Sequence, residues 1–328
     1  MAGIRDVAAS AGVSMATVSH VISGKRSVSA PTRAKVEKAI KELGYRAHPG
    51  AAQLRSGRTG TIALVVPTLE NPFYPLVAVG MQDVLIPREI MLTISDSNGP
   101  GRSENTLRHL ISRRVDAVVA APFGLTEAVL EELHTAQIPF VTLGRVSADG
   151  GDLVHTDDAA GAREITDHLL DRGYRKLAFI GGEEAAVPTK QRLEGFVRAH
   201  QLRALDLRKH QIAYGSFTRE GGRNAARELL TKRERPDAIV AANDLIAIGV
   251  LDAARELGLR VPKDLAVTGY DDIEAASLVS PALTTVENPA REIGRTCARL
   301  LLDRLDGEVS EITRTIGLSH RLIVRQSS

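Results

Sequence analysis

The residues with the clearest chemical potential lie in the first 60 positions, and their types suit contact with a polyanion. Ten Lys or Arg stand there against three acidic residues, a charge of +7, so the remaining residues carry −5 of the net +2. A basic segment on a mildly acidic chain indicates a polyanionic partner for that segment. The hydroxyl and cationic side chains that suit phosphate oxygens are Ser14, Thr17, Ser19, Lys25, Arg26 and Arg33.

Catalytic chemistry is poorly supported by comparison. The sequence contains no P-loop, no HExxH pattern and no nucleophile elbow, and its nine His do not fall at metal-ligand spacing. The glycines of IGGEEAAV, residues 180–187, lack the spacing of a dinucleotide-binding loop. The single cysteine, Cys297, excludes an internal disulfide and a Cys-based zinc site. We therefore expect no enzyme, no metal and no cofactor.

The basic segment needs elements that position it, and its pattern predicts a helix-turn-helix. Within IRDVAASAGVSMATVSHVIS, residues 4–23, the apolar positions Val7, Ala11, Val13, Val18 and Val21 would face inward, and Ala8 allows close helix approach. Gly12 can take the left-handed conformation of a sharp turn between helices. An ordinary helical hairpin is the alternative interpretation.

A third helix should follow and close a small core. Ser29 is a good N-cap with Pro31 in the first turn, Val36, Ile40 and Leu43 share one face, and Gly44 ends the helix. Residues 46–60 then form a linker in which Ala51, Ala52, Gln53 and Leu54 favour helix. A helix this short is marginal in water, so we expect it to form only with a partner.

From Thr61 the sequence changes to the rhythm of a parallel α/β protein. Strand-length apolar runs alternate with helical stretches, namely TIALVVP, IMLTIS, VDAVVAAP, IPFVTLG, KLAFIGG, PDAIVAAND and DLAVTGYD. The irregular region 146–158 separates the first four runs from the last three. We expect two α/β lobes, with a ligand in the cleft where strands end.

Several of these motifs, in this order, resemble the lactose-repressor (LacI/GalR) family of bacterial transcription factors. The resemblance is carried by IRDVAASAGVSMATVSHVIS at 4–23, VSAPTRAKVEKAIKELGY, NPFY at 71–74, DRGYRKLAFIGG, RLEGF at 192–196, the run from AANDLIAIGV to AVTGYDD, SPALTTVENP and RLIVRQS. It implies an all-α helix-turn-helix head and an α/β two-lobed, periplasmic-binding-protein-like body with parallel sheets. Ala47 departs from the family's usual proline, so the hinge helix would be shorter or start later.

The resemblance implies three parts of the chain. Residues 1–45 form the DNA-binding domain, 46–60 the hinge, and 61–328 the effector-binding and dimerisation body. The first lobe would take about 61–157 and 288–316, and the second about 158–287 and 317–328. A homodimer on a palindromic operator follows, and no tetramerisation helix is expected.

By resemblance, Met15, Ala16 and His20 read bases in the major groove. Met15 and Ala16 would contact thymine methyls, and His20 a purine edge. The alternatives are packing for Met15, a phosphate contact or solvent exposure for His20, and helix N-capping for Ser14. Leu54 matches the leucine that wedges between base pairs in the minor groove, flanked by Arg55. The alternative for Leu54 is packing between subunits.

The body would sense a small molecule, with residues assigned by motif match and by position at strand ends. The ligand-binding candidates are Phe73, Tyr74, Arg145, Asp157, Arg192, Phe217, Asn243, Asp244 and Asp271. Asp157 and Asp244 have the alternative of capping helices, and the three aromatic residues that of packing. Arg192 and Asp271 have the alternative of an interlobe salt bridge. A sugar or sugar phosphate is preferred, with a purine-like or other metabolite still open.

The class of protein expected is thus a transcriptional regulator, most often a repressor in this family, under allosteric control. The first residues, MAGIRDVAAS, lack a signal peptide's apolar core, and no apolar run reaches the roughly 18 residues of a membrane span. We expect a cytoplasmic, nucleoid-associated protein. A periplasmic solute-binding protein is the competing class, and export of the chain would favour it.

Overall fold

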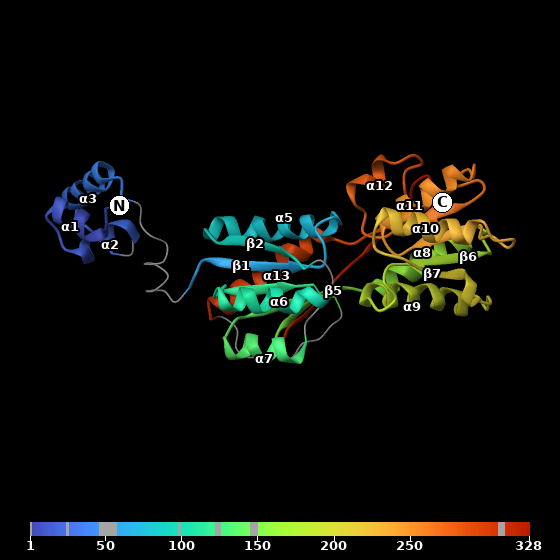
Figure 1. Ribbon diagram of the computed structural model, residues 1–328, viewed down its shortest axis with the longest axis horizontal. Coiled ribbons are helices and arrows are strands. Elements are labelled where there is room, and N and C mark those ends of the chain that lie inside the picture. Colours follow the sequence, from blue (N-terminus) through green and yellow to red (C-terminus); the bar gives the residue numbers. More distant parts are fainter. Residues whose placement is uncertain are drawn as a thin grey trace. The chain divides into compact units, whose positions relative to one another are not determined.

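The structure is a computed structural model that describes residues 2–23, 26–45, 58–97, 100–121, 126–144, 150–307 and 312–328. It forms two compact units that divide between Thr59 and Gly60 (Figure 1). Among the predicted site residues, Lys25, Leu54, Arg55 and Arg145 lie outside the described residues, as does most of the predicted hinge.

The first unit holds the three predicted helices, α1 (Ile4–Ala11), α2 (Met15–Ser23) and α3 (Ala30–Leu43). Its core buries seven residues, Val7, Ala8, Ala11, Val18, Val21, Val36 and Ala39. Gly12 and Gly44 both adopt the left-handed conformation that ends α1 and α3. The prediction for Leu43 was wrong: Leu43 is 38% exposed, and Ala39 takes the inward position because it lies one turn after Val36.

The first lobe of the second unit is a parallel sheet covered on both faces. Its strand order is β11-β5-β4-β3-β1-β2, and every neighbouring pair is parallel. The strands are β1 (Thr61–Val66), β2 (Met91–Asp96), β3 (Ala117–Ala120), β4 (Phe140–Leu143), β5 (Asp152–Thr156) and β11 (Thr315–Leu318). One core lies under α5 (Phe73–Leu85) and α13 (Ala290–Leu305), and another under α6 (Pro100–Ser112) and α7 (Glu127–Thr135) (Figure 1). The short 3-10 helix η1 (Ile86–Arg88) leads from α5 into β2.

The second lobe has a four-stranded parallel sheet in the order β7-β6-β8-β9. Its strands are β6 (Leu177–Gly181), β7 (Ile212–Tyr214), β8 (Ala238–Ala241) and β9 (Ala266–Thr268). Helices α8 (Asp158–Asp171) and α9 (Val187–Leu202) pack together, as do α10 (Arg219–Leu230) and α11 (Asp244–Glu256). The 3-10 helix η2 (Lys209–Gln211), helix α12 (Glu274–Leu278) and the antiparallel pair β10 (Thr285–Glu287) and β12 (Arg321–Ile323) complete the lobe.

The chain passes between the lobes three times, after β5, after β10 and after β11. All seven predicted apolar runs contain strands of the two sheets. The prediction that 146–158 is irregular was wrong, because Asp152–Thr156 is β5, paired with β4 and β11. This five-residue segment opens with an aspartate, so its sequence gave no signal for a strand. Gly317 and Leu318 also pair with β5, two residues beyond the expected edge of the first lobe.

Candidate functional site

Helix α2 presents a polar and apolar mixture on the surface of the head. Ser14, Met15 and Ala16 are exposed at its start, with Met15 47% exposed, while Thr17 and His20 are half-buried. The Ser14 hydroxyl accepts a hydrogen bond from the Thr17 backbone N–H at 3.1 Å, which is the N-capping role foreseen as its alternative. The exposed side chains of Met15 and Ala16 are accessible to a partner, and the Ser14 cap satisfies a backbone N–H at the start of α2.

The remaining predicted head contacts differ in accessibility. Arg26 and Arg33 are exposed, so each can reach an anion. Ser19 is only 8% exposed and lies among the core residues of the head. Ser19 is therefore less accessible to a DNA phosphate than Arg26 and Arg33 are.

The second unit holds a buried ionic centre on Arg192, which α9 carries. Its Nε donates to Asp158 Oδ1 at 2.9 Å, and its Nη2 lies 2.8 Å from the same oxygen. Nη1 donates to the Ala242 carbonyl, and Nη2 reaches Asp271 Oδ1 at 3.4 Å. The guanidinium also lies 3.8 Å from the centre of the Tyr270 ring. Burial opposes the charge of Arg192, but Asp158 and Asp271 outweigh it and raise the pKa of Arg192.

The alternative role of Arg192 and Asp271, a salt bridge between the two lobes, was wrong about where the salt bridge lies. Their ion pair exists, but both residues belong to the second lobe, Arg192 on α9 and Asp271 just after β9. Burial raises the pKa of the Asp271 carboxyl, and Arg192 opposes that rise. Asp271 also has φ 105°, a conformation that a non-glycine residue adopts only when its surroundings hold it. The centre is thus built into the second lobe before any ligand arrives.

Contact with the first lobe comes through Asn71 and Tyr74. Asn71 lies near enough to Asp271 to lower the pKa of that carboxyl, and its Oδ1 accepts from the Phe73 backbone N–H at 3.0 Å. The Tyr74 ring packs edge-on against Phe73, with 5.2 Å between ring centres. Burial, followed by the nearby charge of Asp271, raises the pKa of the Tyr74 hydroxyl. The start of α5 therefore lies against the carboxylates of the second lobe.

Three predicted ligand residues have structural partners. Asp157 is exposed and caps α8, accepting from the Ala160 N–H at 3.0 Å, which is its foreseen alternative. Asn243, and not Asp244, caps α11. Asp244 is buried and accepts from the Ile273 N–H at 2.8 Å and the Thr285 hydroxyl at 2.6 Å. Burial and then Asp271 raise the pKa of Asp244 well above its usual range.

Phe217 is half-buried and packs on the core of the second lobe, with its ring over Gly182 at the end of β6. A side-chain carbon on Gly182 would lie 2.3 Å from that ring. The glycine thus allows Phe217 to close over the carboxyl end of β6, where a ring could also stack on a ligand.

Four members of this site were not predicted from the sequence. They are Asp158, Tyr270 and Asn288, and Asn71 from the first lobe. Asn288 joins the centre through its Nδ2, which donates to Asp271 Oδ1 at 3.3 Å, while its Oδ1 accepts from Thr156. Only Asp158 left a usable signal. Two successive aspartates open a helix, and one residue suffices for the cap, so the second was available for Arg192.

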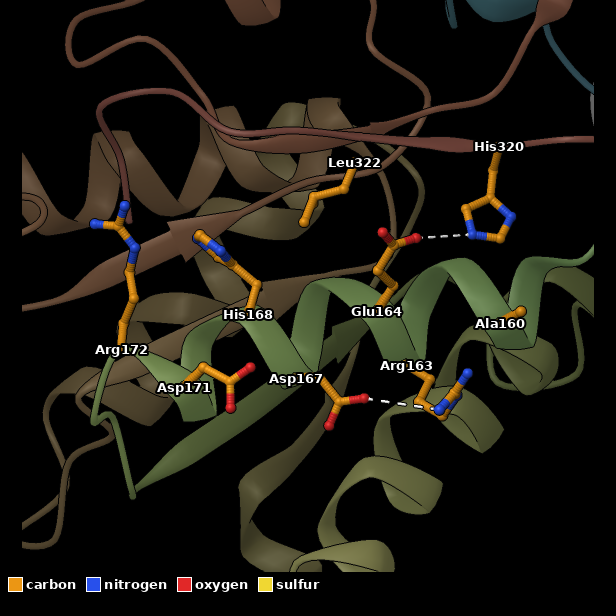
Figure 2. A pocket seen from close by; sticks show the side chains of 9 residues that line it. All are labelled: Ala160, Arg163, Glu164, Asp167, His168, Asp171, Arg172, His320 and Leu322. Carbon is orange, nitrogen blue, oxygen red and sulfur yellow. Dashed lines mark hydrogen bonds and ion pairs between the residues drawn. The ribbon is translucent and has the colours of Figure 1, made fainter.

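A separate pocket of about 530 Å³ lies along α8, and Arg192 is not among the residues that line it (Figure 2). Glu164 and His168 point from α8 towards the segment that carries His320 and Leu322. The His320 Nε2 lies 3.0 Å from Glu164, and Arg172 donates to the Ser328 carbonyl. These pairs tie α8 to residues 320–328, so His320, Glu164 and Arg172 already have partners.

Two absences hold for the described ranges of the chain. No group of three or more His, Cys, Asp or Glu side chains there could hold a metal ion. Nor does any helix in those ranges have the length and apolar character needed to cross a membrane.

Comparison with known proteins matches both units. Residues 3–48 fit the model of bacterial regulatory proteins of the lacI family, and 166–328 that of periplasmic binding protein-like domains. The chain is 36% identical to the HTH-type transcriptional regulator CelR of Thermobifida fusca, over 98% of this chain and 96% of that protein.

Solved structures agree with this match. A CelR–cellobiose complex has a TM-score of 0.76 and 34% identity over 100% of both chains. The lac repressor dimer bound to operator and the anti-inducer ONPF has a TM-score of 0.88 and 26% identity, over 99% of this chain and 98% of that one. The relatives are transcriptional regulators and not enzymes. The protein described here therefore belongs to the LacI family of bacterial transcriptional regulators.

Proposed function

We propose that this protein is a repressor that binds a palindromic operator as a homodimer and is controlled by a sugar-like effector between its lobes. The observation that carries this proposal is the combination of an exposed, capped α2 on a basic head with a buried Arg192 centre that faces the other lobe. Its site of action is the bacterial nucleoid, in the cytoplasm.

Support for operator reading comes from the surface of α2. Exposed Met15 and Ala16 offer only apolar contacts, which suit thymine methyls, and the half-buried His20 offers one hydrogen-bonding ring edge. The phosphate contacts are proposed for Ser14, Thr17, Ser19, Lys25, Arg26, Arg33 and Arg55, and the minor-groove wedge for Leu54. A single helix reads few base pairs, so two heads related by a two-fold axis are needed for a palindrome.

Support for a homodimer comes from the free edge of the first-lobe sheet. Strand β2 ends the sheet and α5 packs beside it. Large apolar side chains are exposed along these elements, with Val79 40%, Ile86 67% and Met91 65% exposed. An edge strand with exposed apolar neighbours is a surface that soluble proteins normally cover. A second copy of the same edge would cover it symmetrically.

Support for the effector site comes from the Arg192 centre and its interlobe neighbours. The relative CelR is known in complex with cellobiose. We assign the contacts chiefly to Tyr74, Arg192 and Asp271, with Phe73 and Phe217 as stacking surfaces. The secondary candidates for effector contact are Asn243, Asp244, Asp157 and Arg145. Ligand binding would close the lobes, shift the first-lobe contacts in the dimer and change the spacing of the two hinge segments.

The deciding experiment is selection of bound duplexes from a random pool with the purified full chain. A palindrome of about 14–20 base pairs is expected, given one half-site per head. Operator affinity is then measured with and without saturating sugars. Linkage requires operator and effector to change each other's affinity by the same factor. Enrichment of no sequence, with and without added metabolites, would overturn the proposal, and unchanged operator affinity at saturating effector would overturn its allosteric part.

A further inference from the structure

The charge balance around Arg192 bears on which effectors the cleft accepts. Arg192, Asp158 and Asp271 are buried, with 5%, 7% and 7% of their surfaces exposed, and together they carry one positive and two negative charges. Each nitrogen of the Arg192 side chain already donates one hydrogen bond within the second lobe, Nε and Nη2 to the carboxylates and Nη1 to the Ala242 carbonyl. The arginine is therefore neutralised within its own lobe and offers little net attraction to an anion.

On the first-lobe side of the site, negative charges also outnumber positive charges around Tyr74. Four charged side chains act on the Tyr74 hydroxyl, namely Arg192 and the carboxylates of Asp158, Asp271 and Glu183. The three carboxylates raise the pKa of Tyr74 and Arg192 alone lowers it, so their net effect is to oppose a negative charge at this position. A phosphate placed between Tyr74 and Arg192 would meet that opposition in a poorly solvated site.

Hydrogen-bonding chemistry leads to the same ligand class. The carboxylates of Asp158 and Asp271 are acceptors only, so a ligand that satisfies them must bring donors. Sugar hydroxyls donate and accept, whereas a phosphate dianion only accepts. Neutral buried groups stand beside the centre: Asn243 Nδ2 and Thr189 Oγ1 have no hydrogen-bond partner among the described residues. Thr189 lies one turn before Arg192 on α9, and Asn243 follows the carbonyl that Arg192 contacts.

We propose that the cleft selects an uncharged polyhydroxylated effector and rejects its phosphorylated or carboxylated counterpart. This inference rests on the proposed effector site, and it chooses between sugars and sugar phosphates, which the sequence left open. The acidic residues Asp158, Asp271 and Glu183 act as the selectivity determinants, because they disfavour added negative charge and require hydroxyl donors.

Isothermal titration calorimetry on the full chain tests it with matched pairs. The probes are cellobiose, ribose and glucose, each beside its phosphorylated form, and gluconate beside glucose. We expect one or more neutral sugars to bind and each binding sugar to lose at least about a hundredfold in affinity on phosphorylation, as one or two repelled charges predict. Tighter or equal binding of a phosphorylated partner would overturn this inference and leave the proposed regulator intact. No binding by any probe would count against both the sugar effector and this inference, while operator selection would still test the head.

Two variants separate charge selection from shape. Glu183→Gln removes an exposed carboxylate after β6, and Glu194→Gln removes an exposed carboxylate on α9 as the matched control. We expect Glu183→Gln to narrow the neutral-to-phosphorylated affinity ratio by about threefold to tenfold, since the Glu183 carboxylate is exposed and its charge is partly screened by water, and Glu194→Gln to leave this ratio unchanged. If the Asp158→Asn variant folds, it should narrow the neutral-to-phosphorylated affinity ratio further than Glu183→Gln does. An unchanged ratio in Glu183→Gln and in folded Asp158→Asn would contradict the charge-based account.

Discussion

Nη2 of Arg192 lies 2.8 Å from Oδ1 of Asp158, and both side chains are buried, Asp158 at the first residue of α8 and Arg192 in the second turn of α9. The pair joins two helices that also pack through a close contact. A side-chain carbon on Gly195 would lie 2.1 Å from the Ala159 carbonyl, so only glycine allows this approach. The site is therefore part of the packing of the second lobe, and changes to it affect stability as well as binding.

Arg192→Met is expected to destabilise the second unit by about 3–5 kcal/mol at pH 7, because it leaves Asp158 and Asp271 buried without their cation. Urea unfolding followed by circular dichroism measures the loss. Asp271 has a raised pKa in the folded protein, so its ionisation opposes folding and its protonation relieves the defect. The deficit should therefore shrink as the pH falls towards 4. Arg198→Met, at an exposed site on the same helix, is the control, and equal losses in both variants would contradict this account.

Asp152→Asn is expected to cost about 2 kcal/mol near neutral pH. The carboxylate is fully buried, and hydrogen bonds from Arg304 and Arg314 overcome the opposing effect of burial and lower its pKa to about 2. A lowered folded pKa contributes stability above the unfolded value near 3.9, and this contribution disappears as the pH falls through 2. Chemical unfolding at pH 7 and pH 3 measures the difference. Asp303→Asn, which removes one half-exposed partner of Arg314, should cost much less.

His20→Ala and Arg33→Ala should separate base reading from phosphate contact. Loss of the His20 ring should cost about 1–3 kcal/mol on the selected operator and relax preference at one position per half-site. Loss of Arg33 should weaken binding to all DNA sequences alike. It should also lower the salt dependence of the DNA affinity by the equivalent of about one phosphate contact per head. Fluorescence anisotropy on operator and random duplexes at several salt concentrations distinguishes them. A uniform effect for His20→Ala would assign that residue to the backbone.

Leu54→Ala should weaken operator binding far more than binding to random DNA. A side chain that wedges between base steps contributes only where the DNA can be kinked. The same anisotropy measurement, with operators that differ only at the central step, tests it. Equal losses on operator and random duplexes would favour the alternative in which Leu54 packs between subunits.

Val79→Lys and Met91→Lys should dissociate the proposed homodimer, because each introduces a charge into the apolar surface around β2. Sedimentation velocity measures the change in oligomeric state, and unchanged thermal unfolding of the monomer would show that the fold is retained. Leu202→Lys at the end of α9, where Leu202 is 54% exposed, is the matched control. Dimers that persist in both β2-edge variants would place the interface elsewhere.

Local patterns determined the head and most of the sheets. Spacing alone predicts the turn at Gly12, the helix Ala30–Leu43 and the seven apolar runs, because each depends on residues a few positions apart. Strand β5 was missed, because its sequence DLVHT mixes polar with apolar residues and forms no continuous apolar run, so its stability comes from the strands beside it.

The composition of the Arg192 centre depended on the tertiary structure. Its members come from five segments of the chain: packing within the second lobe joins Asp158, Arg192 and Asp271, and the passages between the lobes bring Asn71 and Asn288 to them. The sequence offered two adjacent aspartates, Asp157 and Asp158, without distinguishing their roles. Helix geometry turns one to the cap and the next, about 100° further round, towards Arg192. That rotation, and not the type of residue, decided which carboxylate belongs to the site.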